Sequence, residues 1–117
     1  PRDAARRLET LCLMNDTGLP IYVARTQVSS ALHLVIQLAR FPDGSRRVSA
    51  ISEARGLDQS NEYTWNDLFQ FRGSGRDRAG HLQGHLEMLG KPSFASEPYE
   101  MGLQEMVTCT KQLFARS

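Results

Sequence analysis

The histidines, the cysteines and one glycine-rich loop are the parts of this sequence whose residue types could carry catalysis or hold a metal. His81 and His85 are four residues apart, a spacing that brings two ligands to one metal ion on a helix. The segment around them alternates apolar and polar residues as a strand does. On a strand this spacing separates the two residues by about 13 Å, at roughly 3.3 Å per residue. One metal ion cannot bridge such a distance, so we expect no metal site here.

Neither nucleophilic chemistry nor phosphate binding has the residues it needs. His33 stands at the start of an apolar run without an identifiable third group that would make it a base, and neither Cys12 nor Cys109 neighbours a histidine. The loop GSGRDRAG lacks the Lys-Ser/Thr ending of a phosphate-binding loop and precedes a strand pattern instead of a helix. We therefore expect no catalytic, metal-binding or cofactor-binding residue in this chain, and two reduced, buried thiols.

Arg40, Arg46 and Arg47 lie at the two ends of the turn segment RFPDGSRR. One interpretation is a solvated hairpin whose charges discourage pairing with further strands. The other is a cationic patch for a phosphate group or an acidic protein surface, because a planar guanidinium can hold two oxygens at once. The residues alone leave both interpretations open.

Aromatic residues alternate with polar ones in the segment YTWNDLFQF, which places its four rings on one face of a strand. Such a face could stack nucleic-acid bases, but an aromatic strand face is more often part of a core. The predicted core residues are Leu34, Ile36, Leu38, Trp65, Phe69 and Phe71.

The elements that position these residues follow from periodicity and turn signals. The sequence predicts two helices, about four strands and a closing helix, at residues 1–15, 20–32, 34–39, 48–51, 63–71, 81–89 and 96–115. These form one unit, 1–117, with a helical pair at 1–32, a strand meander at 33–90 and a terminal helix at 96–115. Strands joined by short connections pair antiparallel, and the nearly continuous apolar run 34–39 predicts a strand inside the sheet, covered on both faces.

Length and charge limit what such a chain can do. Its 117 residues suffice for one small core, and 14 Lys and Arg against 13 Asp and Glu give a net charge of +1. This balance is too even to indicate a nucleic-acid or membrane-surface partner. No apolar run is long enough to span a membrane, and the first ten residues lack the apolar core of a signal peptide. We expect no nucleic-acid partner and no membrane insertion.

Several short motifs between residues 1 and 56 carry a resemblance to a known family. They are Pro1-Arg2-Asp3-Ala4 with Arg7-Leu8-Glu9, Gly18-Leu19-Pro20, Arg25 with Gln27-Val28-Ser29-Ser30-Ala31, Leu34-Val35-Ile36-Gln37 with Arg40, Asp43-Gly44 with Arg46-Arg47-Val48, and Ile51 with Glu53 and Gly56. In these residues the chain resembles the C-terminal part of the type II/IV secretion-system ATPases, and it is most similar to the CpaF-like motors that assemble Tad pili. Residues 57–94 continue the pattern more loosely.

The resemblance implies an α/β fold, of which this segment, α+β by itself, is the C-terminal part of a RecA-like P-loop ATPase domain. It implies a homo-hexameric ring that is cytoplasmic, peripheral at the inner membrane, and in contact with secretion or pilus-assembly proteins there. The family binds ATP and Mg²⁺ through a Walker A lysine, acidic boxes and a histidine motif, all of which precede the segment seen here. The chain itself is therefore expected to lack hydrolytic machinery. Arg25, Arg40, Arg46 and Arg47 are its candidate subunit-interface residues.

Two other functions remain open at this stage. The chain could be a free-standing, non-enzymatic interaction module derived from such a motor, and a weaker alternative is a nucleic-acid binder that uses its arginine loops and aromatic strand. A chain that opens inside a helix, with no N-cap residue ahead of Pro1, favours a piece of a longer protein. The reading frame upstream of Pro1 would separate the first two functions.

Overall fold

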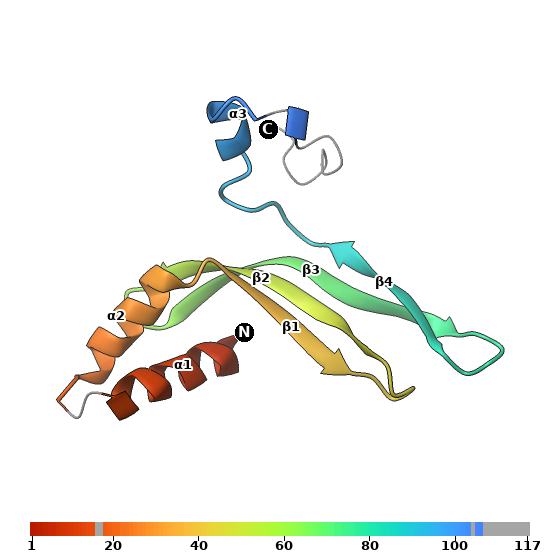
Figure 1. The fold of residues 1–117 in the computed structure, drawn as a ribbon, viewed down its shortest axis with the longest axis horizontal. Helices are drawn as coiled ribbons and strands as arrows, with labels where there is room; N and C mark the ends of the chain where they lie inside the picture. Colours follow the sequence, from red (N-terminus) through yellow and green to blue (C-terminus); the bar gives the residue numbers. More distant parts are fainter. Residues whose placement is uncertain (16–17, 104, 107–117) are drawn as a thin grey trace.

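The computed structural model describes residues 1–15, 18–103, 105 and 106 of the chain. Within these residues the chain forms an α+β fold of three helices and one four-stranded antiparallel sheet, as the turn pattern predicts (Figure 1). The elements are α1 (Arg2–Asn15), α2 (Ile21–Ala31), β1 (Leu34–Arg40), β2 (Arg46–Leu57), β3 (Tyr63–Arg76), β4 (Leu82–Met88) and α3 (Glu97–Glu100). The strands lie side by side in chain order, β1-β2-β3-β4.

An aspartate organises each of the three turns between the strands. In each turn its side chain accepts a hydrogen bond from the backbone N–H two residues later: Asp43 from Ser45, Asp58 from Ser60 and Asp77 from Ala79. This local bond closes a turn without help from the rest of the fold. Sequence-local turns of this kind explain why the strands follow one another as a meander.

β2 and β3 are longer than the sequence pattern suggests, because glycines bend them without ending them. The segments expected as loops at 55–62 and 72–80 are partly strand, since β2 continues to Leu57 and β3 to Arg76. Gly56 and Gly75 have φ angles of 91° and 126°, and the pairing register shifts beside each of them. A glycine with positive φ at a register shift is typical of a β-bulge, so the strand runs on past it.

The core lies where the helix pair meets the sheet. Figure 1 shows α1 and α2 side by side at one end of the sheet. Ala5, Val28 and Tyr63 are buried there, and Trp65 and Cys12 pack against them while partly buried. A core built on small side chains allows close approach of the helices but removes little apolar area from water.

The prediction that Leu34, Ile36 and Leu38 belong to the core is wrong. β1 is an edge strand, and these side chains are 43%, 56% and 73% exposed. Alternate residues of β1 are partly covered, so only one face of the strand is packed. A continuous apolar run cannot by itself distinguish a strand covered on both faces from an edge strand with one face left open.

The aromatic residues of β3, although partly or fully buried, do not form one cluster. Tyr63 and Trp65 pack at the helix pair with ring centroids 6.1 Å apart, whereas the Phe71 ring lies 4.8 Å from the Phe41 ring in the β1–β2 turn. A register shift between these pairs places the additional residue Leu68 in β3. Because a bulge interrupts the two-residue alternation, the predicted single aromatic face does not form.

The closing helix is shorter than predicted. α3 has one turn, and Gly102, with φ of 74°, follows it where a continuous helix 96–115 would have passed. A left-handed glycine is a common way to end a helix. The remainder of the predicted helix, 107–117, and Cys109 with it, lies outside the described residues.

The described chain is extended in shape. Its dimensions are 56 × 42 × 23 Å and its radius of gyration is 17.8 Å, against about 13 Å for a compact domain of this length. None of the helices among the described residues has both the length and the apolar character needed to cross a bilayer.

Candidate functional site

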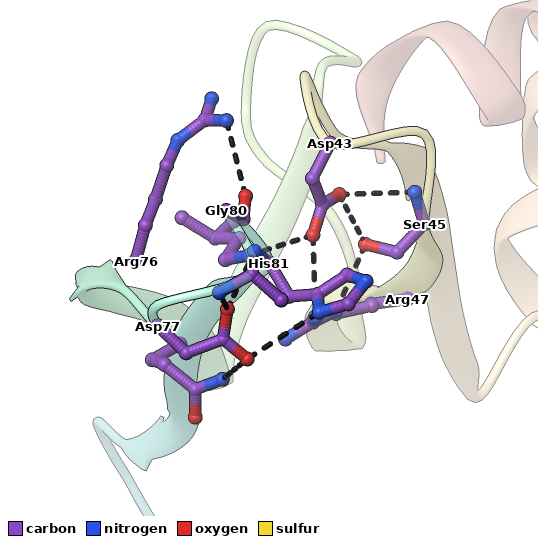
Figure 2. A network of polar contacts seen from close by, with 10 residues as sticks. Asp43, Ser45, Arg47, Arg76, Asp77, Gly80 and His81 are labelled. Carbon is purple, nitrogen blue, oxygen red and sulfur yellow. Dashed lines mark hydrogen bonds and ion pairs between the residues drawn. The ribbon is translucent and has the colours of Figure 1, made fainter.

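Two arginine-bearing turns, distant in sequence, meet at the end of the sheet that lies away from the helices. The backbone N–H of Leu82, at the start of β4, donates a 2.7 Å hydrogen bond to Oδ2 of Asp43 in the β1–β2 turn. Figure 2 shows this contact and the polar network around it. The bond fixes the β1–β2 turn against the β3–β4 turn.

Asp43 is the centre of this network. Besides Leu82, its carboxylate accepts bonds from the Ser45 hydroxyl at 2.5 Å and the Ser45 N–H at 2.9 Å, and Arg47 Nη2 lies 3.5 Å away. The hydrogen bonds from Ser45 and Leu82 outweigh desolvation and hold the pKa of Asp43 well below its usual range. The carboxylate therefore stays charged and serves as a structural acceptor.

The guanidinium of Arg47 makes contacts within its own chain, so not all of its N–H donors are free to bind a partner. Its Nε donates a 3.0 Å bond to the Ser45 hydroxyl, and its guanidinium carbon lies 5.8 Å from the centroid of the Phe71 ring. Cation–π contact and the ion pair to Asp43 account for its position. The structure therefore gives this candidate interface residue a role in joining the turn to β3.

Asp77 orders the β3–β4 turn in the same way. It accepts bonds from the backbone N–H groups of Ala79 and His81, both at 2.9 Å, and His81 Nδ1 lies 3.3 Å from its other oxygen. These contacts, led by the backbone bond from His81, lower the pKa of Asp77. His81 thus caps a turn, and no cluster of three or more metal-binding side chains occurs in the part of the chain that the structure describes.

Arg40 and Arg46 differ from Arg47 because they have no counter-charge. They stand directly opposite each other in the β1–β2 pairing, and both are exposed. Among residues 1–15, 18–103, 105 and 106, no hydrogen bond or ion pair engages either guanidinium. Like charges at directly opposed positions destabilise a sheet, so these arginines do not contribute to the fold as Arg47 does.

Arg25 does not lie with the other candidate arginines. Its Nε bonds to Glu9 at 3.0 Å, and its Nη1 lies 3.1 Å from the Asn61 carbonyl oxygen and 3.5 Å from Glu62. These contacts place it at the β2–β3 turn, at the opposite end of the sheet from Arg40. The structure therefore separates it from the other three candidate arginines, and its structural role is to join α1, α2 and the sheet.

Glu53 forms a second internal site, which sequence reasoning did not single out. It is 4% exposed, and its carboxylate accepts bonds from the Ser93 N–H and hydroxyl and from Asn66 Nδ2. Burial would raise the pKa of Glu53, but the bonds from Ser93 and Asn66 together outweigh it and lower the pKa. The only sequence signal was its place in the Ile51-x-Glu53 motif, which does not say that the side chain is buried.

Apolar side chains line a cavity at the helix pair. A cavity of about 260 Å³ between α1 and α2 is lined mainly by apolar side chains, including Leu8, Cys12 and Val28. Leu11 and Met14 of the same helix are exposed at 57% and 73%. Contiguous uncovered apolar surface of this kind marks a place where a protein packs against another.

A second apolar surface is the open face of the sheet. Ile36, Ile51, Phe69 and Met88 form one row of paired residues across all four strands, and paired residues project from the same face. Leu34, Leu38 and Arg40 extend this face along β1 because they lie two residues apart. We call this surface, with Leu86 and Arg46 at its margins, the open sheet face.

In this arrangement Tyr63 and Trp65 do not form a surface on which nucleic-acid bases could stack. Tyr63 is 7% exposed and Trp65 packs against the helix-pair core, so neither ring is presented to a ligand. Burial and the neighbouring Glu9 carboxylate raise the pKa of Tyr63 above its usual range, and its hydroxyl stays protonated. A scan against models of known protein families gives no match for this chain, and a search of curated proteins gives none either.

Proposed function

We propose that this chain is a non-catalytic packing segment of a secretion or pilus-assembly ATPase, and that its apolar surfaces meet the RecA-like core and neighbouring subunits. One observation carries the proposal: the described part of the chain leaves many of its large apolar side chains exposed to solvent. Among the described residues the buried hydrophobic side chains are Ala5, Ala24, Val28, Tyr63 and Leu68, whereas Leu11, Met14, Ile36, Leu38 and other large hydrophobic side chains are exposed. A monomer that functions alone rarely exposes contiguous apolar surface on this scale.

The helix pair is the surface we assign to the ATPase core. Its cavity between Leu8, Cys12 and Val28 is open and almost wholly apolar in lining, and the exposed Leu11 and Met14 lie on α1 beside it. Packing such a groove against a larger domain would remove this area from water, at roughly 25 cal/mol per Å² of apolar surface. Apolar side chains of the partner would then complete the small core.

The open sheet face, with Arg40 and Arg46, is the surface we assign to subunit contacts. We assign this role to Arg40 and Arg46 in preference to Arg25 and Arg47, because Glu9 and Asp43 already pair with the latter two within the chain. In the complete motor, ATP and Mg²⁺ would bind to residues of the core, and the assembly would sit in the cytoplasm against inner-membrane secretion or pilus proteins. The contribution of this segment is then architectural, through packing and contact.

A binding experiment with the separately expressed RecA-like core of a CpaF-like ATPase tests the proposal. The 117-residue chain should show no ATP turnover and should copurify with the core. Leu11→Glu should abolish copurification, because a charge in an apolar interface remains unpaired when buried. Thr10→Glu is the matched control, since Thr10 is an exposed neighbour on α1 whose hydroxyl bonds only back to the Arg6 carbonyl among the described residues.

Two results would contradict the proposal. The first is binding to the core that Leu11→Glu and Thr10→Glu weaken equally, or no binding by the parent chain. The second is magnesium-dependent ATP hydrolysis by the purified chain that a substitution within it abolishes, because the described residues would then contain a catalytic site.

A further inference from the structure

The open sheet face has a chemical complement within the same chain. We name residues 97–103, 105 and 106 the acidic arm; its glutamates Glu97, Glu100 and Glu105 are all exposed. Its apolar residues Met101, Leu103 and Met106 are 70%, 41% and 79% exposed. No lysine or arginine occurs between residues 92 and 106. The arm therefore combines apolar side chains with uncompensated negative charge.

The open sheet face combines apolar side chains with uncompensated positive charge. Leu34, Ile36 and Leu38 lead along β1 to Arg40, which stands opposite Arg46 in the pairing of β1 with β2. Two opposed cations repel each other unless an anion lies between them or beside them. A carboxylate is the natural occupant, because each guanidinium can hold its two oxygens in a planar, bidentate contact.

The segment that leads to the arm meets only the Leu34 end of this face, and the arm does not reach Arg40 and Arg46 within its own chain. Ser93 is tied to Glu53, and Glu53 pairs with Leu34 at the start of β1. Arg40 is six residues farther along the strand, about 20 Å away at roughly 3.3 Å per residue. Figure 1 shows α3 set apart from the four strands.

We infer that the acidic arm of one copy of this chain docks on the open sheet face of a second copy, with Glu97 and Glu100 meeting Arg40 and Arg46. The inference deepens the proposed function by naming the partner surface of the subunit contact, and it rests on that function only for the expectation that copies meet. The two surfaces in contact are different, so the association is head-to-tail. Such a contact leaves one arm and one face unused in every dimer.

Charge reversal with rescue tests this contact in the full 117-residue chain. Sedimentation velocity over a wide concentration range should show reversible self-association of the parent. Arg40→Glu with Arg46→Glu should weaken it by about tenfold or more, because like charges then face each other across the contact, and Glu97→Arg with Glu100→Arg should do the same. The four substitutions combined should restore the parent dissociation constant within about threefold, since the opposed charges are again complementary.

A control with the same change in charge separates the face from overall electrostatics. Arg6 and Arg78 are exposed arginines outside the open sheet face. Arg6→Glu with Arg78→Glu should leave the dissociation constant within about threefold of the parent value. Circular dichroism and the unfolding midpoint check that every variant is folded, which is expected because all six positions are exposed.

The inference is overturned if the parent remains monomeric up to millimolar concentration, if the control weakens association as much as the face variant, or if the combined variant stays as weak as either pair alone. Contact between arm and face that is independent of concentration would also overturn it, because the arm would then bind its own sheet. Leu11→Glu, which tests binding to the ATPase core, should leave the self-association of this chain unchanged. The two experiments can therefore refute the helix-pair contact and the arm contact independently of each other.

Discussion

The buried carboxylate of Glu53 should be worth more to this chain than any surface ion pair. Three donors converge on it: the Ser93 N–H at 3.0 Å, the Ser93 hydroxyl, and Asn66 Nδ2 at 3.0 Å. A glutamine at this position keeps the shape but replaces one acceptor oxygen with an NH₂ group, which must face at least one of these donors. Hydrogen bonds to a charged group are worth about 1.5–3 kcal/mol, so we expect Glu53→Gln to lower the free energy of unfolding by about 2–3 kcal/mol at pH 7.

The direction of the pKa shift of Glu53 also predicts how this stabilisation changes with pH. The pKa of Glu53 in the folded chain lies below its ordinary value of 4.5. The unfolded chain therefore takes up the proton first as the pH falls, and the stabilisation is fully present above pH 4.5 and declines as the pH falls toward the folded pKa. The difference in stability between parent and Glu53→Gln should shrink over this interval.

Urea unfolding at several pH values between 7 and 3 measures both effects. Glu87→Gln is the matched control: Glu87 pairs with Arg72 at 2.6 Å, but the two side chains are 46% and 54% exposed. An exposed pair of this kind contributes at most about 1 kcal/mol. If Glu53→Gln costs no more than Glu87→Gln, or if its effect grows as the pH falls, the argument from convergent donors is wrong.

Three further substitutions test the packing. Gly84→Ala should destabilise the chain by about 1–3 kcal/mol in thermal or urea unfolding, because the new methyl group would lie 2.5 Å from the Phe71 ring; full stability would contradict this packing. Trp65→Phe should change stability by less than about 1 kcal/mol, since the buried indole N–H has no hydrogen-bond partner among the described residues, and a larger loss would show that the N–H is satisfied. Arg25→Ala should cost about 2 kcal/mol by leaving the buried Glu9 without its cation, and a double-mutant cycle with Glu9→Gln should show coupling; additive losses would refute the pair.

The local features of the fold could be predicted because their signals are local. The helix pair follows from apolar spacing, and the Pro42-Asp43-Gly44 turn from its residue types, so α1, α2 and the antiparallel order agree with expectation. The bulges at Gly56 and Gly75 cannot be told from loops in the sequence, because a glycine that bends a strand has the same signature as one that ends it.

The candidate site was predicted only in part, because the sequence does not show which charges are compensated. Four arginines looked equivalent, but Glu9 neutralises Arg25 and Asp43 neutralises Arg47 through contacts between distant or turn residues. The open sheet face was missed for a different reason. An apolar run predicts burial, and its exposure at an edge depends on which elements pack over it.

The motifs that carry the family resemblance turn out to hold this chain together. Glu9 and Arg25 belong to two of the motifs and form an ion pair, and Asp43 fastens the turn to β4. Glu53 anchors the segment after β4, and Gly56 permits a bulge with φ of 91°. These residues explain how a segment with so small a core can have a defined fold.

The edge position of β1 also affects how readily newly made copies of the chain aggregate. The outer side of Leu34–Arg40 pairs with no other strand among the described residues, and its first six residues carry no charge. A strand of this composition with a free edge is a template on which identical strands can stack. Arg40 and Pro42, which follow the run, act as gatekeepers against such stacking. The chain should therefore gain solubility when it is produced together with the surface that covers β1, and it should tend to form fibrous aggregates when it is overproduced without that surface.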